Sequence, residues 1–455
     1  MSLGKWFAAR GPRVVQQRAD ALLHRYGLSP TKAARRIEEC RETLASVGCA
    51  PTFATPGIVV QRYPQFIRRL QDSGAEIAVH GYQHIDLSAL PVPVAVQQLS
   101  RAVRTFEHSG IQVHGFRGPY LGCGDELRDA LPDGLFDYSS NQAVYLGTPH
   151  PPLGVGPDNL AGNRSEFFET LCRFYRGKPF SDTVCLPSVC ANGYSVPPAT
   201  RVPPQAMAPG GLIEIPVCVP DDLQLNDGLR LGPEEIGQVW IQMLDQVYQR
   251  GELFSLLFHP ELASVYGQSF VAVLQKARGL QPQVWIARLC DISDWWREKS
   301  RFAVVISPTP QDLQLSFTCS ERATILAKGL SACGSEPTWD GACIRLTTTN
   351  LNVPAEPRPF IGLPTDTPEH ILGFLREQGY ILDTSETAAR CGIYIDAATL
   401  ARLTSKVKLI DHIEKSPGPL VRYGRWPNGA KSAMCISGDL DALSLLDYAS
   451  RLFIR

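Results

Sequence analysis

The sequence contains no run of about 18 apolar residues, so it predicts no membrane-spanning helix. Its opening residues, Met1 to Trp6, lead into Arg-rich sequence without the apolar core of a signal peptide. Neither sign of charge is in excess, since 44 Lys and Arg and 45 Asp and Glu give a formal net charge of -1. This balance provides no electrostatic attraction for nucleic acid or for an acidic membrane surface. We therefore expect a cytoplasmic protein with neither of these partners.

The paired cysteine spacing of a disulfide framework is also missing. The 13 cysteines are scattered, and the gap between Cys185 and Cys190, the one close pair, fits no zinc-finger pattern. We interpret the cysteines as structural, buried thiols of a reducing compartment. The chain has enough hydrophobic residues to form folded domains, since they make up 44% of its 455 residues. This length predicts two or three domains.

Short strand-like and longer helix-like segments alternate through the first 299 residues. Residues 30–47 indicate a helix with Ser29 as its N-cap, and the strand Thr52 to Thr55 follows it. The alternation continues to residue 299 around a Pro-, Gly- and Ser-rich excursion at 147–211, where we expect substrate selectivity to lie. Such a rhythm predicts an α/β fold with a mainly parallel sheet, expected to form a barrel, whose strand ends carry the chemistry.

The pattern changes after Lys299. Residues 300–355 predict a small antiparallel β-rich module, because β-branched segments follow one another without helices. Residues 356–425 predict an α/β segment, and residues 426–455 a strand and a helix. No motif between residues 300 and 425 indicates a catalytic or binding site. Three roles remain open for this region: it could bind sugar, mediate dimerisation, or form the connection that returns the last strand to the first domain.

Two histidines four residues apart, His80 and His84, follow the apolar run Glu76 to Val79. We interpret this run as a buried strand that enters a turn. At this spacing two imidazoles can face one point, which is the arrangement that a divalent ion needs from neutral nitrogen ligands. The alternative is two unrelated histidines of the surface or the core.

Three further stretches follow the histidine pair: Arg117-Gly118-Pro119-Tyr120, Asp137-Tyr138-Ser139-Ser140 and Leu257-Phe258-His259-Pro260. In this order and on a β/α background, the four stretches resemble the polysaccharide deacetylase family, also called the NodB homology family. The resemblance covers residues 50–298 or so. It implies a distorted (β/α) barrel that hydrolyses N-acetyl groups with one divalent metal ion.

The first motif of that family, a strand ending in an aspartate pair, has no counterpart before Thr52. It occurs instead near residue 440, where Ala433 to Ser437 lead into Gly438-Asp439-Leu440-Asp441 behind a Trp-Pro-x-Gly-Ala sequence. We expect a circular permutation, in which this strand is the first strand of the barrel. A second, truncated deacetylase copy and strand exchange between two chains are the alternatives.

The resemblance implies a metal site formed by Asp441, His80 and His84. Zinc is the expected ion, with cobalt or nickel as substitutes, because two imidazoles and a carboxylate do not suit magnesium or calcium. Asp439 would take the proton of the attacking water and Arg117 would keep Asp439 ionised. A turn at Gly438 would exchange the roles of the two aspartates.

Three other residues complete the implied site. The backbone N–H at Tyr120 would bind the oxyanion with the metal, and His259 would protonate the leaving amine. Asp137 would steady Arg117 or hold His259 charged. Each of these residues could instead have a purely structural role: a surface ion pair for Arg117, a helix or turn cap for Asp137 and a core aromatic for Tyr120. Asp221-Asp222 is interpreted as a turn cap.

Two functions follow from this pattern. The first is a metal-dependent deacetylase that hydrolyses a linear amide of an N-acetylated amino sugar or related carbohydrate. The second is a non-catalytic carbohydrate-binding or scaffold protein of the same fold, in which Asp439 and Asp441 never meet His80. The partners expected are a small-molecule or carbohydrate substrate and a second copy of the chain in a homodimer.

Overall fold

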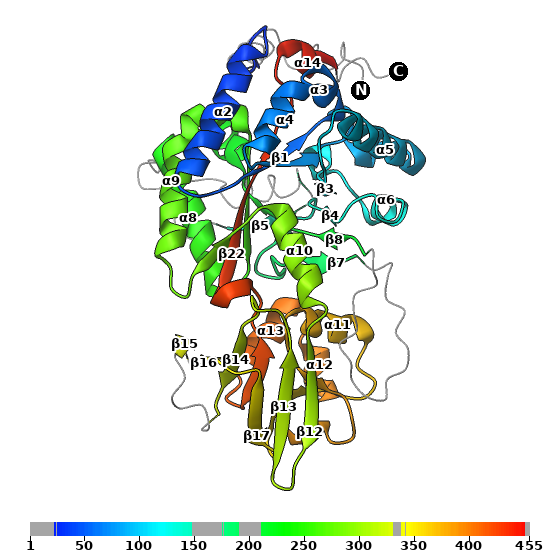
Figure 1. The fold of residues 1–455 in the computed structure, drawn as a ribbon, viewed down its shortest axis with the longest axis vertical. Helices are drawn as coiled ribbons and strands as arrows, with labels where there is room; N and C mark the ends of the chain where they lie inside the picture. Colours follow the sequence, from blue (N-terminus) through cyan, green and yellow to red (C-terminus); the bar gives the residue numbers. More distant parts are fainter. Residues whose placement is uncertain are drawn as a thin grey trace.

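The computed structural model of the chain describes residues 22–23, 25–147, 175, 177–190, 211–330, 338–341 and 343–450. Its described residues form a large upper part, up to residue 299 and from residue 426 onward, and a smaller lower part between residues 300 and 425 (Figure 1). None of the described helices has the length and hydropathy needed to cross a bilayer. The predicted excursion at 147–211 lies mostly outside the described residues.

Strands and helices alternate in the large part, as predicted. Its helices are α2 (Thr31–Ser46), α3 (Gly57–Arg62), α4 (Pro64–Asp72), α5 (Val92–His108), α6 (Asp125–Asp129), α8 (Pro233–Gln249), α9 (Ala263–Gly279), α10 (Leu289–Lys299) and α14 (Leu445–Ser450). Its strands are β1 (Thr52–Thr55), β2 (Glu76–Val79), β3 (Gly115–Phe116), β4 (Tyr138–Ser139), β5 (Ala143–Tyr145), β6 (Lys178–Pro179), β7 (Ser188–Val189), β8 (Ile213–Glu214), β9 (Val217–Val219), β10 (Leu253–Phe258), β11 (Val284–Ile286) and β22 (Ser432–Asp439).

These strands form one twelve-stranded sheet with β22 in its middle. The order is β6-β5-β9-β10-β22-β1-β2-β3-β4-β8-β7, and β11 pairs with β22 outside this path. Ser437 of β22 lies opposite Thr52 of β1 on one side and Leu257 of β10 on the other, and both pairings are parallel. The strand after Trp426 thus lies beside the Thr52 strand, as predicted. Among the described residues β6 and β7 do not pair with each other, so the sheet is a curled, open form of the predicted distorted barrel.

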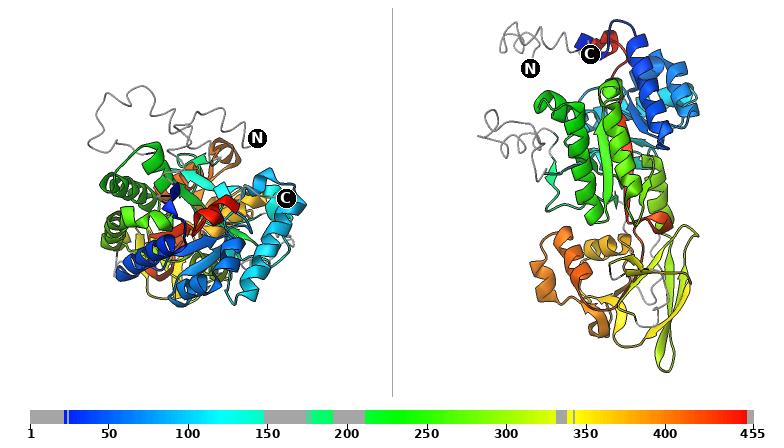
Figure 2. Two further views of the ribbon diagram at one scale, coloured as in Figure 1. Left: turned by 90° about the horizontal axis from the view of Figure 1, so that it is seen from above. Right: turned by 90° about the vertical axis from the view of Figure 1, so that its left-hand side faces the viewer.

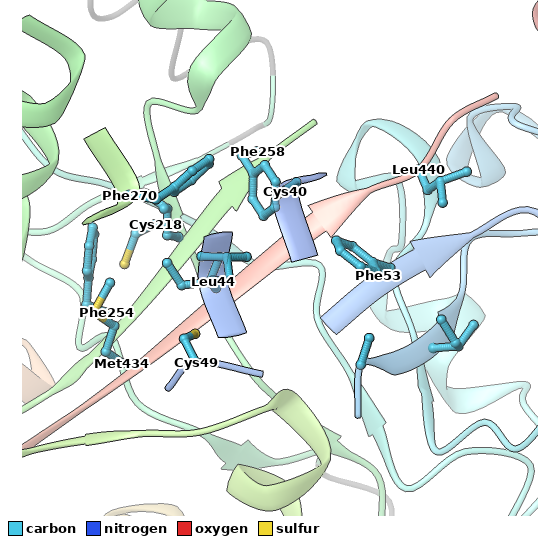
Figure 3. Packing of buried hydrophobic residues seen from close by; sticks show 14 of the residues in the cluster. Cys40, Leu44, Cys49, Phe53, Cys218, Phe254, Phe258, Phe270, Met434 and Leu440 are labelled. Carbon is cyan, nitrogen blue, oxygen red and sulfur yellow. The ribbon is translucent and has the colours of Figure 1, made fainter. Parts of the chain in front are cut away.

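The central strands are buried on both faces. Because side chains of a strand alternate, Met434 and Ile436 of β22 enter the core beneath the helices, while Ala433 and Cys435 belong to a second core on the other face. Side chains from β22, β10 and the segment around α2 meet in the first core (Figure 3). Helices α2, α8 and α9 stand side by side over this face (Figure 2).

Ile436→Ala is expected to lower the free energy of unfolding by about 2–5 kcal/mol, because its side chain is fully buried and its loss leaves a cavity. Val94→Ala is the matched control, since Val94 lies on α5 with 40% of its surface exposed. The control is expected to change stability by less than about 0.5 kcal/mol. Urea denaturation of both variants measures the difference, and equal changes would contradict the central position of β22.

The lower part contains three small sheets. Its strands are β12 (Ala303–Pro308), β13 (Asp312–Thr318), β14 (Ile325–Lys328), β15 (Thr338–Asp340), β16 (Cys343–Leu346), β17 (Asn350–Pro354), β18 (Arg358–Gly362), β19 (Leu382–Asp383), β20 (Cys391–Tyr394) and β21 (Leu420–Tyr423), and its helices are α11 (Glu369–Glu377), α12 (Ala397–Arg402) and α13 (Lys406–Lys415). The sheet orders are β12-β13-β17, β15-β16-β14-β21 and β19-β18-β20. Because β21 pairs with β14, strands from 300–355 and 356–425 share one sheet.

Buried tryptophans lie where the two parts meet. The rings of Trp296 and Trp426 lie 5.6 Å apart, and the indole N–H of Trp426 donates to the carbonyl of Gly251 at 3.0 Å. Trp295 donates to the carbonyl of Arg425 at 2.9 Å. From this junction β22 runs upward to α14 (Figure 1). The lower part therefore lies at the amino end of β22, away from the strand ends that carry the chemistry in such sheets.

Candidate active site

Four of the predicted site residues lie at the carboxyl ends of neighbouring parallel strands. His80 follows β2, Arg117 follows β3, His259 follows β10 and Asp439 ends β22. The strands pair in the order β10-β22-β1-β2-β3, so their ends meet at one edge of the sheet. All four side chains are buried.

A tight turn brings His84 back to His80. The turn starts at Gly81, whose φ of +71° lies in the left-handed region that favours glycine. The two imidazole rings are 5.0 Å apart. Nδ1 of His80 lies 2.7 Å from the carbonyl oxygen of Arg117, and because a carbonyl only accepts, this nitrogen carries the proton. This contact leaves Nε2 of His80 as the nitrogen that can coordinate a metal ion.

Asp441 completes a group of three possible ligands with the two histidines, and one ligand atom from each lies within 4.8 Å of the others. Oδ1 of Asp441 is 2.9 Å from Nε2 of His84 and 3.6 Å from Nε2 of His80. Among the described residues, Oδ1 of Asp441 and Nε2 of His80 are buried without a hydrogen-bond partner. A buried carboxylate oxygen and buried imidazole nitrogens that converge on one point are ligands that fit a bound cation. Burial raises the pKa of Asp441, but His84, His80 and Arg25 together hold that pKa well below its usual range.

Arg117 and Asp439 form a buried ion pair. Nη1 of Arg117 donates to Oδ1 of Asp439 at 3.0 Å, which is the pairing that the sequence predicted. The remaining N–H groups of Arg117 donate to Ser140 and to the hydroxyl of Ser437. The other carboxylate oxygen of Asp439 lies 3.8 Å from Nε2 of His80. Asp439 is thus held beside the three possible ligands with one oxygen toward them.

His259 is held by Asp222, which sequence reasoning assigned to a turn cap. Asp222 accepts from Nδ1 of His259 at 2.8 Å and from its backbone N–H at 3.0 Å. Burial lowers the pKa of His259, but the charge and hydrogen bond of Asp222, together with the charge of Asp441, raise the pKa to about 10. The imidazole is therefore a cation at neutral pH, as a proton donor must be. Asp221 does serve as a cap, because it accepts from the backbone N–H of Gln224 at 2.7 Å.

The prediction for Asp137 is wrong in its contacts. Asp137 accepts from His114 at 3.2 Å and lies 3.7 Å from Arg297, and its side chain is half-exposed. It contacts neither Arg117 nor His259, because it precedes β4 and so lies at the amino end of a parallel strand. Asp222 follows β9 and lies at the carboxyl end. The two acids differ in the strand end that each adjoins: the amino end for Asp137 and the carboxyl end for Asp222.

Tyr120 lies in a strained turn beside the histidines. Its φ is 59° and that of Leu121 is 55°, which is uncommon for residues other than glycine. The ring centroids of Tyr120 and His84 are 4.9 Å apart in an edge-to-face arrangement. Tyr120 has 42% of its surface exposed. Tyr120 is therefore a rim residue of the site and not a core aromatic.

Arg25 also reaches this site, and sequence reasoning did not find it. Its Nη2 lies 3.3 Å from Oδ2 of Asp441, and its Nε donates to Oε1 of Glu261 at 2.5 Å. The Glu261 side chain is fully buried and that of Arg25 is 12% exposed. No pattern in the sequence marks Arg25, because it lies before the first strand in a stretch with several arginines.

Comparison with protein families finds a match to the polysaccharide deacetylase model over residues 28–133. Through this segment the chain is similar to the polysaccharide deacetylase family. The segment holds His80, His84 and Arg117, whereas Asp439, Asp441 and His259 lie outside it. The site is therefore formed by residues of the matched segment, 28–133, together with His259, Asp439 and Asp441, which lie far from it in the sequence.

Solved structures of the polysaccharide deacetylase family are among the structural neighbours. A protein from Mycobacterium smegmatis described as a polysaccharide deacetylase is 19% identical over 62% of this chain and 83% of its own, with a TM-score of 0.41. One from Pseudomonas aeruginosa PAO1 is 18% identical over 59% and 74%, also at 0.41. Peptidoglycan deacetylase PdaC from Bacillus subtilis is 29% identical over 22% and 48%, at 0.20. No curated protein gives a match.

Proposed function

We propose that the chain is a metal-dependent amide hydrolase that removes an acetyl or similar acyl group from the nitrogen of an amino sugar or related carbohydrate. The observation that supports this most is the convergence of three buried possible ligands, His80, His84 and Asp441, next to Asp439. The scaffold alternative requires both aspartates to lie away from His80. They lie 3.6 and 3.8 Å from its Nε2.

His80, His84 and Asp441 would hold the ion. Three protein ligands leave coordination positions open, so the ion would supply Lewis acidity toward the amide carbonyl and lower the pKa of water. The donor set favours zinc, with cobalt or nickel as substitutes. Nδ1 of His80 is fixed by the carbonyl of Arg117, which keeps its Nε2 available.

Asp439 and His259 divide the proton transfers. Asp439, which accepts a hydrogen bond from Arg117 at 3.0 Å, would accept the proton of the attacking water. His259, kept protonated by Asp222, would donate its proton to the leaving amine through the ring nitrogen that Asp222 does not contact. The backbone N–H of Tyr120 would bind the oxyanion, and its strained turn is consistent with a preorganised donor.

A circular permutation within one chain is part of the proposal. The parallel pairing of β22 with both β1 and β10 supports it, because the aspartate-bearing strand then takes the sheet position that the family motif order requires. The alternative of strand exchange between two chains would place Asp441 in the site of a partner. The two accounts differ in the species that binds the metal ion.

Elemental analysis of chelator-free protein is expected to find about one zinc, cobalt or nickel per chain in the monomer fraction from size exclusion. That fraction is also expected to release acetate from N-acetylated oligosaccharides. Metal below about a tenth of an equivalent, after preparation without chelators, would favour the scaffold function. Metal confined to a dimer would instead favour strand exchange.

A further inference from the structure

Residues 25–27 hold the segment that carries Asp441. The backbone N–H of Leu445 donates to the carbonyl of Gly27 at 3.0 Å. The buried ring of Tyr26 lies 5.5 Å from the ring of Tyr448. Arg25 extends the same contact to the site, because its Nη2 is 3.3 Å from Oδ2 of Asp441. The two segments lie at opposite ends of the sequence and meet above the strand ends.

The two oxygens of Asp441 face different partners. Oδ2 faces Arg25, and Oδ1 faces Nε2 of His84 at 2.9 Å and Nε2 of His80 at 3.6 Å. A guanidinium on one oxygen fixes the plane of the carboxylate and leaves the other oxygen directed at the histidines. A carboxylate without this partner has more freedom to rotate away from them.

Glu261 balances the charge of Arg25. Its Oε1 lies 2.5 Å from both Nε and Nη2 of Arg25, and its side chain is fully buried. A lone guanidinium beside a metal site would repel the ion, whereas the Arg25–Glu261 pair carries no net charge. Arg25 already contacts the carboxylates of Glu261 and Asp441. We therefore do not interpret it as a binding residue for a carboxylate of the substrate.

We infer that Arg25 is a positioning residue that holds Asp441 in its metal-binding orientation, with Glu261 as the counter-charge that makes this possible. The inference rests on the proposed metal site. It adds a residue before the first strand, 416 positions from Asp441, to the determinants of metal affinity. Residues that orient a metal ligand typically change affinity by about 10- to 100-fold when they are replaced.

The test is zinc affinity, measured on metal-free full-length protein by competition with a chromophoric chelator. Arg25→Met is expected to weaken zinc binding by about 10- to 100-fold. Arg62→Met is the matched control, because Arg62 also pairs with a buried acid of the same segment, Asp447 at 2.5 Å, without reaching Asp441. The control is expected to bind zinc as the unaltered protein does, and a loss equal to that of Arg25→Met would overturn the inference.

A double variant separates positioning from folding. Arg25→Met alone leaves Glu261 as an unpaired buried acid, so Arg25→Met with Glu261→Gln is expected to regain thermal stability but not zinc affinity. Unaltered zinc affinity in Arg25→Met, or full recovery in the double variant, would overturn the role of Arg25. If the unaltered chain binds no zinc, the proposed metal site fails, and the inference fails with it.

Discussion

Asp439→Asn is expected to keep the metal ion and to lose about 10²- to 10⁴-fold in the rate of amide hydrolysis. Asparagine keeps the size of the side chain and an oxygen for Arg117, which donates to Asp439 at 3.0 Å. It lacks the basicity to accept a proton from water. Metal content and acetate release, measured on the same preparation, check both halves of this expectation.

Asp441→Asn is the paired variant and is expected to lose the ion itself. Oδ1 of Asp441 lies 2.9 Å from His84 and 3.6 Å from His80, so a neutral amide at this place removes the only carboxylate of the ligand group. If Asp439→Asn empties the site and Asp441→Asn does not, the base and the ligand are exchanged. Thermal melting of both variants is the control for folding, because Asp439 also neutralises buried Arg117.

Asp222→Asn is expected to move the alkaline limb of the pH–rate profile to lower pH. Burial lowers the pKa of His259 and Asp222 raises it to about 10, so removal of the Asp222 charge leaves burial dominant. A proton donor is lost as pH rises through its pKa. A His259 pKa at or below its ordinary 6.5 would therefore reduce the rate at pH 8 by about 30-fold or more.

The same pair links stability to pH. Because the pKa of His259 is raised on folding, its stabilising contribution is fully present below pH 6.5 and is lost as pH rises from 6.5 to about 10. Asp137→Asn is the control for both effects, since Asp137 pairs with His114 and not with His259. If the alkaline limb moves in Asp137→Asn and stays in Asp222→Asn, the sequence-based assignment of Asp137 is right and the present one is wrong.

Local patterns allowed much of the site to be predicted. His80 and His84 are close in the chain, so their convergence needs only one turn after a strand. Arg117 and Asp439 are 322 positions apart, yet the resemblance to the polysaccharide deacetylase motifs implied their pairing. The absence of an aspartate-bearing strand before Thr52 likewise predicted that β22 would fill the place beside β1.

Register and long-range packing explain what was not predicted. Asp137 and Asp222 both adjoin strands, and only exact strand bounds show that one precedes β4 and the other follows β9. Arg25 contacts Glu261 and Asp441 across 236 and 416 positions without any repeating pattern. The two-residue strands β3 and β4 carry too little periodicity to fix such bounds from sequence.

The central place of β22 has a consequence for synthesis on the ribosome. The strands β1, β2 and β3 emerge long before their missing neighbour, since Arg117 precedes Asp439 by 322 residues. At about 5–20 residues per second, that interval lasts roughly 15–65 s. During this time β1 presents an unpaired edge, β10 presents one from its own synthesis onward, and the lower part is translated before β22. The upper sheet therefore gains its central strand only after translation has passed residue 439. We expect chaperones that bind exposed strand edges to act before that point.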